Sequence, residues 1–216
     1  MAGQGLRVAV LSLDDLYLAP DDRAHLARFV HPLLGVRGVP GTHDVALGCA
    51  VLAALRARAP VALPRFDKAT DAPRPAADWP VAGPVDLVLF EGWCVGARGQ
   101  PPAALAAPVN ALERDADPDG AWRRFVNAQL AEPYRPLFAS IDRLIVLRAP
   151  DWPTVVGWRQ AAERAGPRAM DDAAVACFCA HFERLTRHVA AEMPGRADLL
   201  VDLAADRTVA SVRRGG

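Results

Sequence analysis

The sequence predicts an α/β protein with a mostly parallel sheet and helices on both faces. Four short apolar runs are separated by helical patterns, and this alternation is typical of a parallel sheet. The runs are almost continuously apolar, which favours strands covered on both faces. A chain of 216 residues has room for one large domain, so we expect a single domain over residues 1–216.

The predicted strands cover residues 7–13, 85–90, 143–147 and 199–203. Helical patterns lie between them, at about residues 20–30, 45–55, 122–130 and 171–193. Pro20 suits the first position of the first helix, and Asp44 is placed to cap the second. The fourth pattern is the clearest, and Pro194-Gly195 ends it.

The charge balance narrows the choice of partners. The 25 basic and 25 acidic residues cancel, whereas binding of nucleic acid or an anionic membrane needs a basic face. No signal-peptide pattern and no apolar run of about 20 residues is present. We therefore expect a cytoplasmic protein whose four cysteines are reduced core thiols, since they show no C-x-x-C spacing.

Acidic residues follow the first two predicted strands. Asp14 and Asp15 end the first strand, and Glu91 ends the second, before Trp93. Ligands of open parallel sheets bind at the carboxyl ends of strands, where a carboxylate can orient Mg²⁺ or accept a proton from a hydroxyl. The alternative is that Asp15 caps a turn and Glu91 pairs with an arginine.

A glycine-containing loop, residues 37–44, precedes the second helix. Such a loop can present backbone N–H groups to an anion, and Arg37 adds a planar guanidinium. His43 flanks the same turn. A plain capping loop would explain Thr42 and Asp44 equally well.

Two further groups of charges have simple alternatives. Arg65, Asp67 and Lys68, the only lysine of the chain, surround one aromatic residue, as a solvated loop also would. Arg159 lies four residues before Glu163, so a surface ion pair is the alternative to a functional role.

Six segments stand out along the chain: SLDDLYL (12–18), RGVPGTHD (37–44), LPRFDKATD (63–71), LVLFEGW (87–93), VNALE (109–113) and WRQAAE (158–163). In this order they resemble D-glycerate 3-kinase and its bacterial kinase-like relatives. Those proteins are P-loop small-molecule kinases similar to phosphoribulokinase, uridine kinase and pantothenate kinase. The resemblance covers about residues 7–207.

The resemblance implies an ATP-dependent kinase that phosphorylates a hydroxyl of glycerate or a similar hydroxy acid, with ATP as co-substrate and Mg²⁺ as cofactor. It implies that Asp14 is the catalytic base, that Glu91 lies near Mg²⁺, and that Arg159 in a lid-like region (about 151–172) stabilises the transferred phosphoryl group. The acceptor pocket would be lined by Asp15, Tyr17, Arg37, His43, Asp44, Arg65, Asp67, Lys68 and Trp93. The choice of acceptor and the oligomeric state stay open.

The sequence departs from this family in one respect. Relatives carry a strand and a G-x-x-x-x-G-K-[ST] loop upstream of the position of Arg7, and no such loop occurs in this chain. The fold would therefore lack the P-loop strand, and we expect either a longer chain or a partner to fill its place. These residues alone should bind ATP weakly. The alternative function is a non-catalytic remnant that binds a small anionic metabolite or a protein partner.

Overall fold

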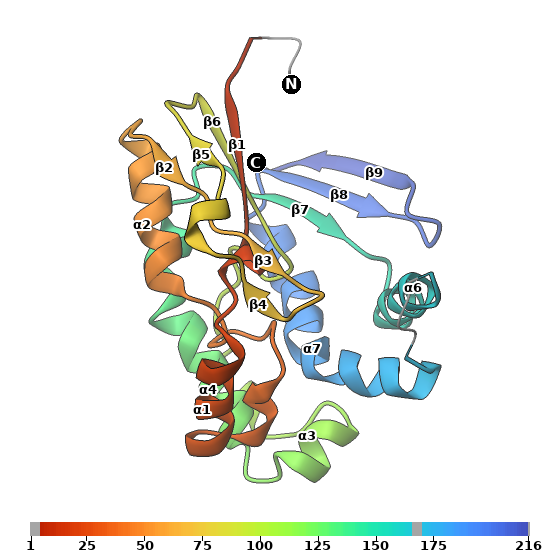
Figure 1. The fold of residues 1–216 in the computed structure, drawn as a ribbon. Helices are drawn as coiled ribbons and strands as arrows, with labels where there is room; N and C mark the ends of the chain where they lie inside the picture. The colour runs from red at the N-terminus through yellow and green to blue at the C-terminus, as the bar shows by residue number, and fades with distance from the viewer. Residues whose placement is uncertain (1–4, 166–169, 216) are drawn as a thin grey trace. The chain divides into compact units, whose positions relative to one another are not determined.

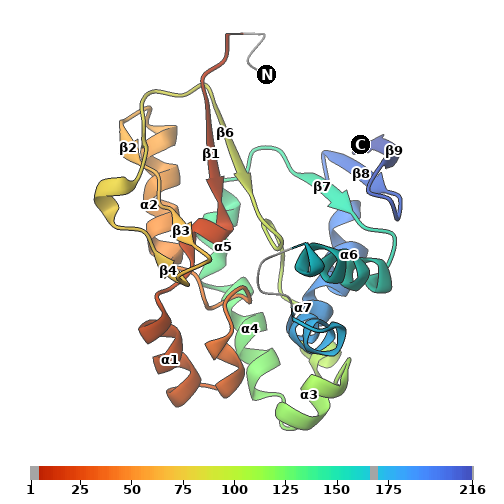
Figure 2. The same ribbon diagram turned by 45° about the vertical axis from the view of Figure 1, so that its right-hand side comes forward.

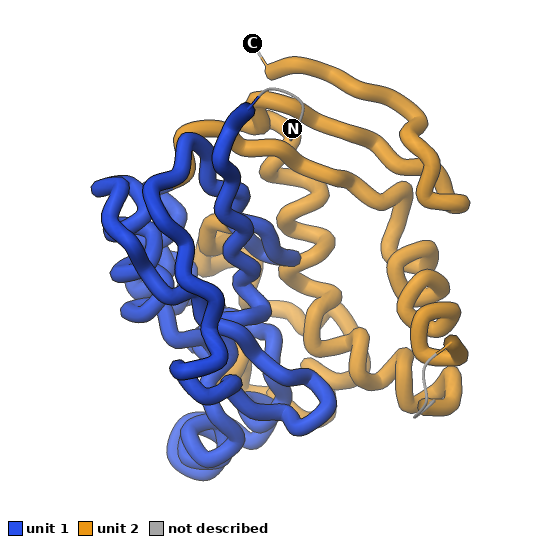
Figure 3. Tube along the Cα trace, turned by 45° about the horizontal axis from the view of Figure 1, so that its top comes forward, with its two compact units in different colours: residues 1–95, 124–140 blue, residues 96–123, 141–216 orange. Residues whose placement is uncertain are grey.

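The computed structural model describes residues 5–165 and 170–215, in which helices and strands alternate as the sequence predicts. The mixed α/β class is confirmed (Figure 1). The chain forms two compact units, unit 1 (residues 1–95 and 124–140) and unit 2 (residues 96–123 and 141–216), shown in Figure 3. The expected single domain stays a prediction.

Unit 1 holds the first predicted strands and helices. Its elements are β1 (Val8–Ser12), η2 (Leu13–Leu16), α1 (Pro20–Phe29), η3 (Pro32–Gly35), α2 (Val45–Arg56), β2 (Val61–Ala62), β3 (Phe66–Asp67), β4 (Ala72–Pro73), η4 (Ala76–Asp78), β5 (Val81–Ala82), β6 (Leu87–Glu91) and α5 (Tyr134–Ala139). Here η marks a 3₁₀ helix. The predicted starts of both long helices are confirmed, because α1 begins at Pro20 and the Asp44 side chain accepts a hydrogen bond from Leu47 N at the start of α2.

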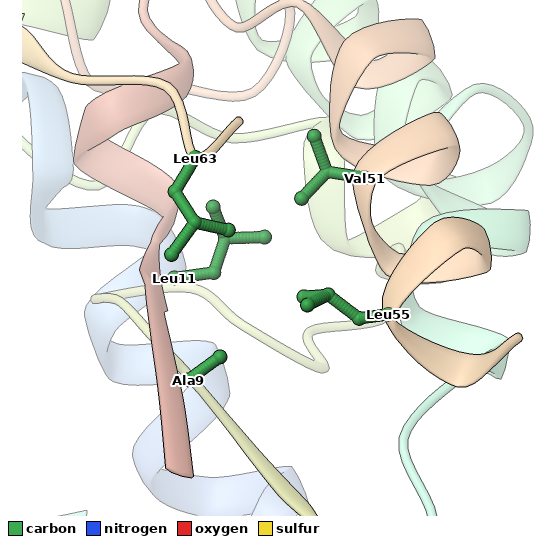
Figure 4. Packing of buried hydrophobic residues seen from close by; sticks show 5 residues of the cluster. All are labelled: Ala9, Leu11, Val51, Leu55 and Leu63. Carbon is green, nitrogen blue, oxygen red and sulfur yellow. The ribbon is translucent and has the colours of Figure 1, made fainter. Parts of the chain in front are cut away.

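β1 and β6 form a parallel pair in unit 1 (Figure 2). Its register runs from Val8 opposite Leu87 to Ser12 opposite Glu91. Their inward residues pack against α2, where Val51 and Leu55 point toward Ala9 and Leu11 (Figure 4).

One face of β1 and β6 is only partly covered, although the sequence predicts strands that are covered on both faces. Val10 and Leu89, paired in the register, are 46% and 49% exposed. Each strand therefore alternates between a buried face toward α2 and a half-exposed apolar face.

Two pairs of very short strands were not predicted from the sequence. β2 pairs with β5 and β3 with β4, each antiparallel and two residues long. A two-residue strand is too short to show a periodic pattern, and Pro73 within β4 favours a loop. The β3–β4 pair matters for the site, because it holds the segment around Phe66.

Unit 2 contains the third and fourth predicted strands. Its elements are η5 (Pro102–Leu105), α3 (Ala111–Ala116), β7 (Ile145–Arg148), α6 (Trp152–Arg164), α7 (Asp172–Glu192), η6 (Met193–Gly195), β8 (Leu199–Leu203) and β9 (Val209–Arg214), whereas α4 (Ala121–Ala131) begins in unit 2 and continues in unit 1. β7 pairs with β8 in parallel, and β9 adds an antiparallel strand. Val146 and Leu200 of this sheet pack on Met193.

The long helix α7 follows the predicted pattern. Asp171 caps it by accepting from Ala174 N, and Val175, Cys179 and Leu185 of its apolar stripe are buried. All four cysteines are free thiols, as expected, but Cys177 is exposed, because it lies on the outer side of the same helix. The expectation that all four are core thiols is therefore wrong for Cys177.

The expected lid-like region, about residues 151–172, consists of α6 and the start of α7. Its residues 166–169 lie outside the described residues. Within the described ranges, none of the helices combines the length and the apolar character that a membrane crossing requires.

Candidate active site

The carboxyl ends of β1 and β6 bring acidic residues to one edge of unit 1. Ser12, the last residue of β1, lies opposite Glu91, the last residue of β6. The Ser12 side chain then caps η2 by accepting from Asp14 N at 3.3 Å, so the chain turns at once into a short helix that carries Asp14 and Asp15. The two strands therefore end at the same edge, as the sequence predicts.

Gly92 is required by close packing at this edge. A Cβ at Gly92 would lie 2.6 Å from the Leu13 Cβ, a distance that real Cβ atoms do not reach. The backbone after Glu91 thus passes directly against η2. This packing fixes the strand end that carries Glu91 beside the helix that carries Asp14.

Asp14 is held by two donors. The Tyr17 hydroxyl donates to Oδ1 at 2.7 Å, and Lys68 Nζ donates to Oδ2 at 2.6 Å. Burial raises the pKa of the Asp14 carboxyl, but the hydrogen bonds from Lys68 and Tyr17 and the charge of Lys68 outweigh it, so the pKa lies below its ordinary value. Asp14 is therefore a carboxylate at neutral pH.

Tyr17 and His43 form an aromatic stack behind Asp14. Their rings lie 4.9 Å apart at 29°, and their backbones form an isolated antiparallel bridge. The His43 ring is 5% exposed, and burial lowers its pKa to about 4. Its Nδ1 lies 2.6 Å from the hydroxyl of Tyr134, a fully buried residue of α5. His43 is neutral at pH 7.

Asp15 and Arg65 contact each other. Asp15 Oδ2 accepts from Arg65 Nη1 at 3.2 Å, and its Oδ1 accepts from Phe66 N at 3.0 Å. Asp15 thus fastens β3 to η2 through contacts 50 and 51 positions apart, which differ from the local turn cap of the alternative. The predicted contact of both side chains with a substrate stays a prediction.

The loop at residues 37–44 differs from the predicted anion cradle, because its N–H groups have internal acceptors. Gly38 N donates to Thr42 Oγ1, Gly41 N to the Tyr134 hydroxyl, and Asp44 N to Leu16 O. With Asp44 capping α2, the capping-loop alternative describes the backbone better than the cradle does.

Arg37 has a partner that the sequence did not reveal. Its Nη1 bonds to Asp71 Oδ1, while the buried Arg23 donates to Asp71 Oδ2 at 2.6 Å. The Arg37 guanidinium also lies 5.7 Å from the centre of the Phe66 ring. Asp71 ends the LPRFDKATD segment, so its place in that motif was the available signal.

Asp67 and Trp93 are the remaining predicted residues of unit 1. Asp67 is half-buried in β3; its Oδ1 accepts from Ala69 N at 2.8 Å, and this bond lowers its pKa. Trp93 is half-buried and follows the Glu91-Gly92 turn. The structure brings four predicted residues into one connected set of contacts, namely Asp14, Tyr17, His43 and Lys68. The other predicted residues of unit 1 surround that set through the loop and β3.

Arg159 lies in unit 2, on α6. Its Nη2 donates to Glu163 at 2.5 Å, and its guanidinium lies 5.4 Å from the centre of the Phe178 ring. The ion-pair alternative therefore describes its contacts. A role of Arg159 toward a phosphoryl group stays a prediction.

Glu91 is the candidate ligand for Mg²⁺. It is exposed at the strand end, and its side chain makes no hydrogen bond or ion pair with another described residue. Among the described residues no group of three or more His, Cys, Asp or Glu is arranged to hold a metal ion. A single free carboxylate fits Mg²⁺, which often takes one or two protein carboxylates and completes its shell with water and substrate phosphates.

Comparisons with known proteins agree with this architecture. No family model matches the chain. The chain is 31% identical over 190 residues to the chloroplastic D-glycerate 3-kinase of Arabidopsis thaliana, covering 81% of this chain but only 39% of that protein. It is also 31% identical over 190 residues to a Schizosaccharomyces pombe protein called uncharacterized kinase mug58, covering 81% of this chain and 67% of that protein.

Solved structures give the same result for the fold. The D-glycerate 3-kinase of Cryptococcus neoformans matches with a TM-score of 0.80 at 25% identity, over 99% of this chain and 81% of that one. A putative fructose transport system kinase of Silicibacter matches with a TM-score of 0.56 at 19% identity, over 88% and 73% of the two chains, which supports the fold alone.

The fold is thus that of the P-loop-like α/β kinases. Within that class, the chain belongs to the D-glycerate 3-kinase family and its kinase-like relatives. It spans about two fifths of the length of the Arabidopsis relative that it matches.

Proposed function

We propose that this protein is an ATP-dependent phosphotransferase that phosphorylates a hydroxyl of glycerate or a similar hydroxy acid. The observation that carries the proposal is the Asp14 carboxylate, ionised and oriented by two donors at the edge where Glu91 also ends its strand. Membership of the D-glycerate 3-kinase family supports the choice of acceptor.

In this proposal, Asp14 accepts the proton of the attacking hydroxyl. An acceptor hydroxyl that donates to Oδ2 would take the place of Lys68, while Tyr17 keeps Oδ1 in position. The low pKa of Asp14 makes it a weak base, and this suits a loose phosphoryl-transfer transition state, in which the hydroxyl proton leaves late. The main contribution of Asp14 is then to orient the hydroxyl.

Three cations around Asp14 and β3 suit the carboxylate of a hydroxy acid. Lys68 is the freest of them, because its side chain is 58% exposed and bonds only to Asp14 among the described residues. Arg37 and Arg65 are each about one-third exposed and are bound to aspartates. A substrate carboxylate that attracts Lys68 would also free Asp14 Oδ2 for the hydroxyl.

Glu91 would hold Mg²⁺, which, when bound, neutralises charge on the phosphates of the nucleotide. Arg159 is proposed to approach the transferred group after leaving Glu163.

The second candidate is a binding protein without turnover. It is favoured by the cations near Asp14, which can hold an anion whether or not a phosphoryl group is transferred. The ligand of such a protein would be a small anionic metabolite, held by Lys68, Arg37 and Arg65.

Phosphate transfer from radiolabelled ATP to glycerate, and to other hydroxy acids, tests the proposal directly. We expect transfer that requires Mg²⁺ and falls at least a hundredfold in Asp14→Asn, whereas Asp22→Asn, an exposed carboxylate on α1, serves as the matched control. Calorimetric titration with Mg-ATP and with glycerate is run in parallel. If glycerate binds but Mg-ATP does not, and no transfer occurs, the kinase proposal fails and the binding protein remains.

A further inference from the structure

Tyr134 is a fully buried polar residue that the proposed reaction does not use. It lies on α5, and its hydroxyl accepts from Gly41 N at 2.9 Å and lies 2.6 Å from His43 Nδ1. No other acceptor for this hydroxyl appears among the described residues. The Tyr134 hydroxyl therefore has an acceptor for its hydrogen only if it donates to His43 Nδ1.

This hydrogen bond defines the protonation of His43. An Nδ1 atom that accepts carries no proton, so the neutral ring holds its hydrogen on Nε2. Burial keeps the ring neutral, with a pKa of about 4. Tyr134 thus fixes both the tautomer and the orientation of the His43 ring.

The fixed His43 ring in turn limits Tyr17. The two rings are stacked, and Phe66 contacts the Tyr17 ring edge-on, with centroids 5.2 Å apart at 81°. The Tyr17 ring therefore has packed neighbours on two sides. Its hydroxyl can reach Asp14 Oδ1 only from the position that these neighbours define.

We infer that Tyr134 is a positioning residue, which acts through His43 and Tyr17 on the orientation of the Asp14 carboxylate. The inference rests on the proposed function for its catalytic meaning, but the contacts themselves do not depend on it. It also implies that the Tyr17 hydroxyl positions Asp14 and does not bind the substrate.

The first test needs no enzymatic activity. In protein labelled with ¹⁵N-histidine, the spectrum at pH 7 should show His43 with hydrogen on Nε2 and a bare, hydrogen-bonded Nδ1; His43→Gln identifies its signals among the five histidines. Tyr134→Phe should move the Nδ1 signal. The inference is overturned if His43 carries hydrogen on Nδ1, or if Tyr134→Phe leaves both nitrogen signals in place.

The second test is kinetic. Tyr17→Phe keeps the ring stack but removes the hydroxyl, so kcat should fall about tenfold while KM stays within about twofold. Since the charged form of Asp14 loses one donor, the acidic limb of the kcat/KM profile should move to higher pH. Besides Tyr17, the groups that act on Asp14 are Lys68 and His43, with the Cys94 thiol also close enough to feel its charge.

Tyr134→Phe should shift the same limb in the same direction. Phe138→Leu is the matched control, because it changes packing 5.7 Å from the Tyr134 ring and keeps every hydroxyl. A rise in KM with unchanged kcat in Tyr17→Phe would instead place Tyr17 on the substrate and refute the inference. Absence of any transfer by the wild-type protein would refute the proposed function, while the histidine spectrum would still decide the inference.

Discussion

Buried His43 predicts a specific loss of stability in mild acid. Its pKa is about 4 in the folded protein because burial disfavours the charged ring, whereas the ordinary value is 6.5. The unfolded chain therefore takes up the proton first as the pH falls. The stability that His43 contributes is complete above pH 6.5 and is lost as the pH falls from 6.5 to 4.

The magnitude follows from the difference between the two pKa values. One pKa unit is equivalent to about 1.4 kcal/mol, so protonation of the unfolded state lowers the free energy of unfolding by about 3 kcal/mol across this range. That is a large share of the roughly 5–15 kcal/mol that stabilises a typical domain. Two-thirds of the loss should occur above pH 5, before most carboxylates begin to protonate.

Urea unfolding of the wild type and His43→Gln, at intervals from pH 7.5 to pH 4.5, measures this loss. A glutamine at position 43 cannot titrate, so its stability should fall less steeply below pH 6.5 than that of the wild type. His25→Gln removes an exposed imidazole from α1 and is the control for the substitution itself. If the wild type and His43→Gln show parallel curves, the buried neutral state of His43 is wrong.

Three further substitutions test the packing at Gly41, the buried ion pair of Asp117 and the role of Lys68. Gly41→Ala forces an alanine to a φ of +103° and places its Cβ 2.6 Å from a Phe125 ring atom. Urea unfolding should show that the free energy of unfolding falls by about 2–5 kcal/mol. Gly157→Ala, in open space on α6, is the control and should raise it by up to about 1 kcal/mol. Asp117→Ala leaves Arg123 buried without its carboxylate and should cost about 3–5 kcal/mol by the same measurement; a loss under 1 kcal/mol would contradict the buried pair. Lys68→Ala removes a largely exposed ion pair, so it should change stability by under about 1 kcal/mol yet weaken glycerate binding at least tenfold in calorimetry.

Much of the backbone was predictable because local signals agreed with long-range packing. Pro20, Asp44 and Asp171 mark helix starts through rules that act within one turn, and the structure uses all three. The strand at residues 199–203 was found with its observed bounds, since four of its five residues are apolar. β9 was missed because its apolar residues, Val209, Ala210 and Val212, do not alternate with polar ones and its end carries two arginines.

The site was predictable at the strand ends and less so around them. Asp14 and Glu91 follow apolar runs, and the rule about carboxyl ends of parallel strands places both at one edge. Tyr134 and Asp71 act through contacts with residues far away in the sequence, at separations of 91 and 34 positions. No local pattern encodes such contacts, so only the folded chain reveals them.

The solitary side-chain amine of this protein gives experimental access to its chemistry. Lys68 is the only lysine in 216 residues, and its nitrogen lies 2.6 Å from an Asp14 oxygen. An acylating reagent thus has one internal target, apart from the chain's terminal amino group, and mass spectrometry can follow its modification without ambiguity. Comparing the rate of that modification with and without a candidate metabolite would report whether the metabolite protects Lys68.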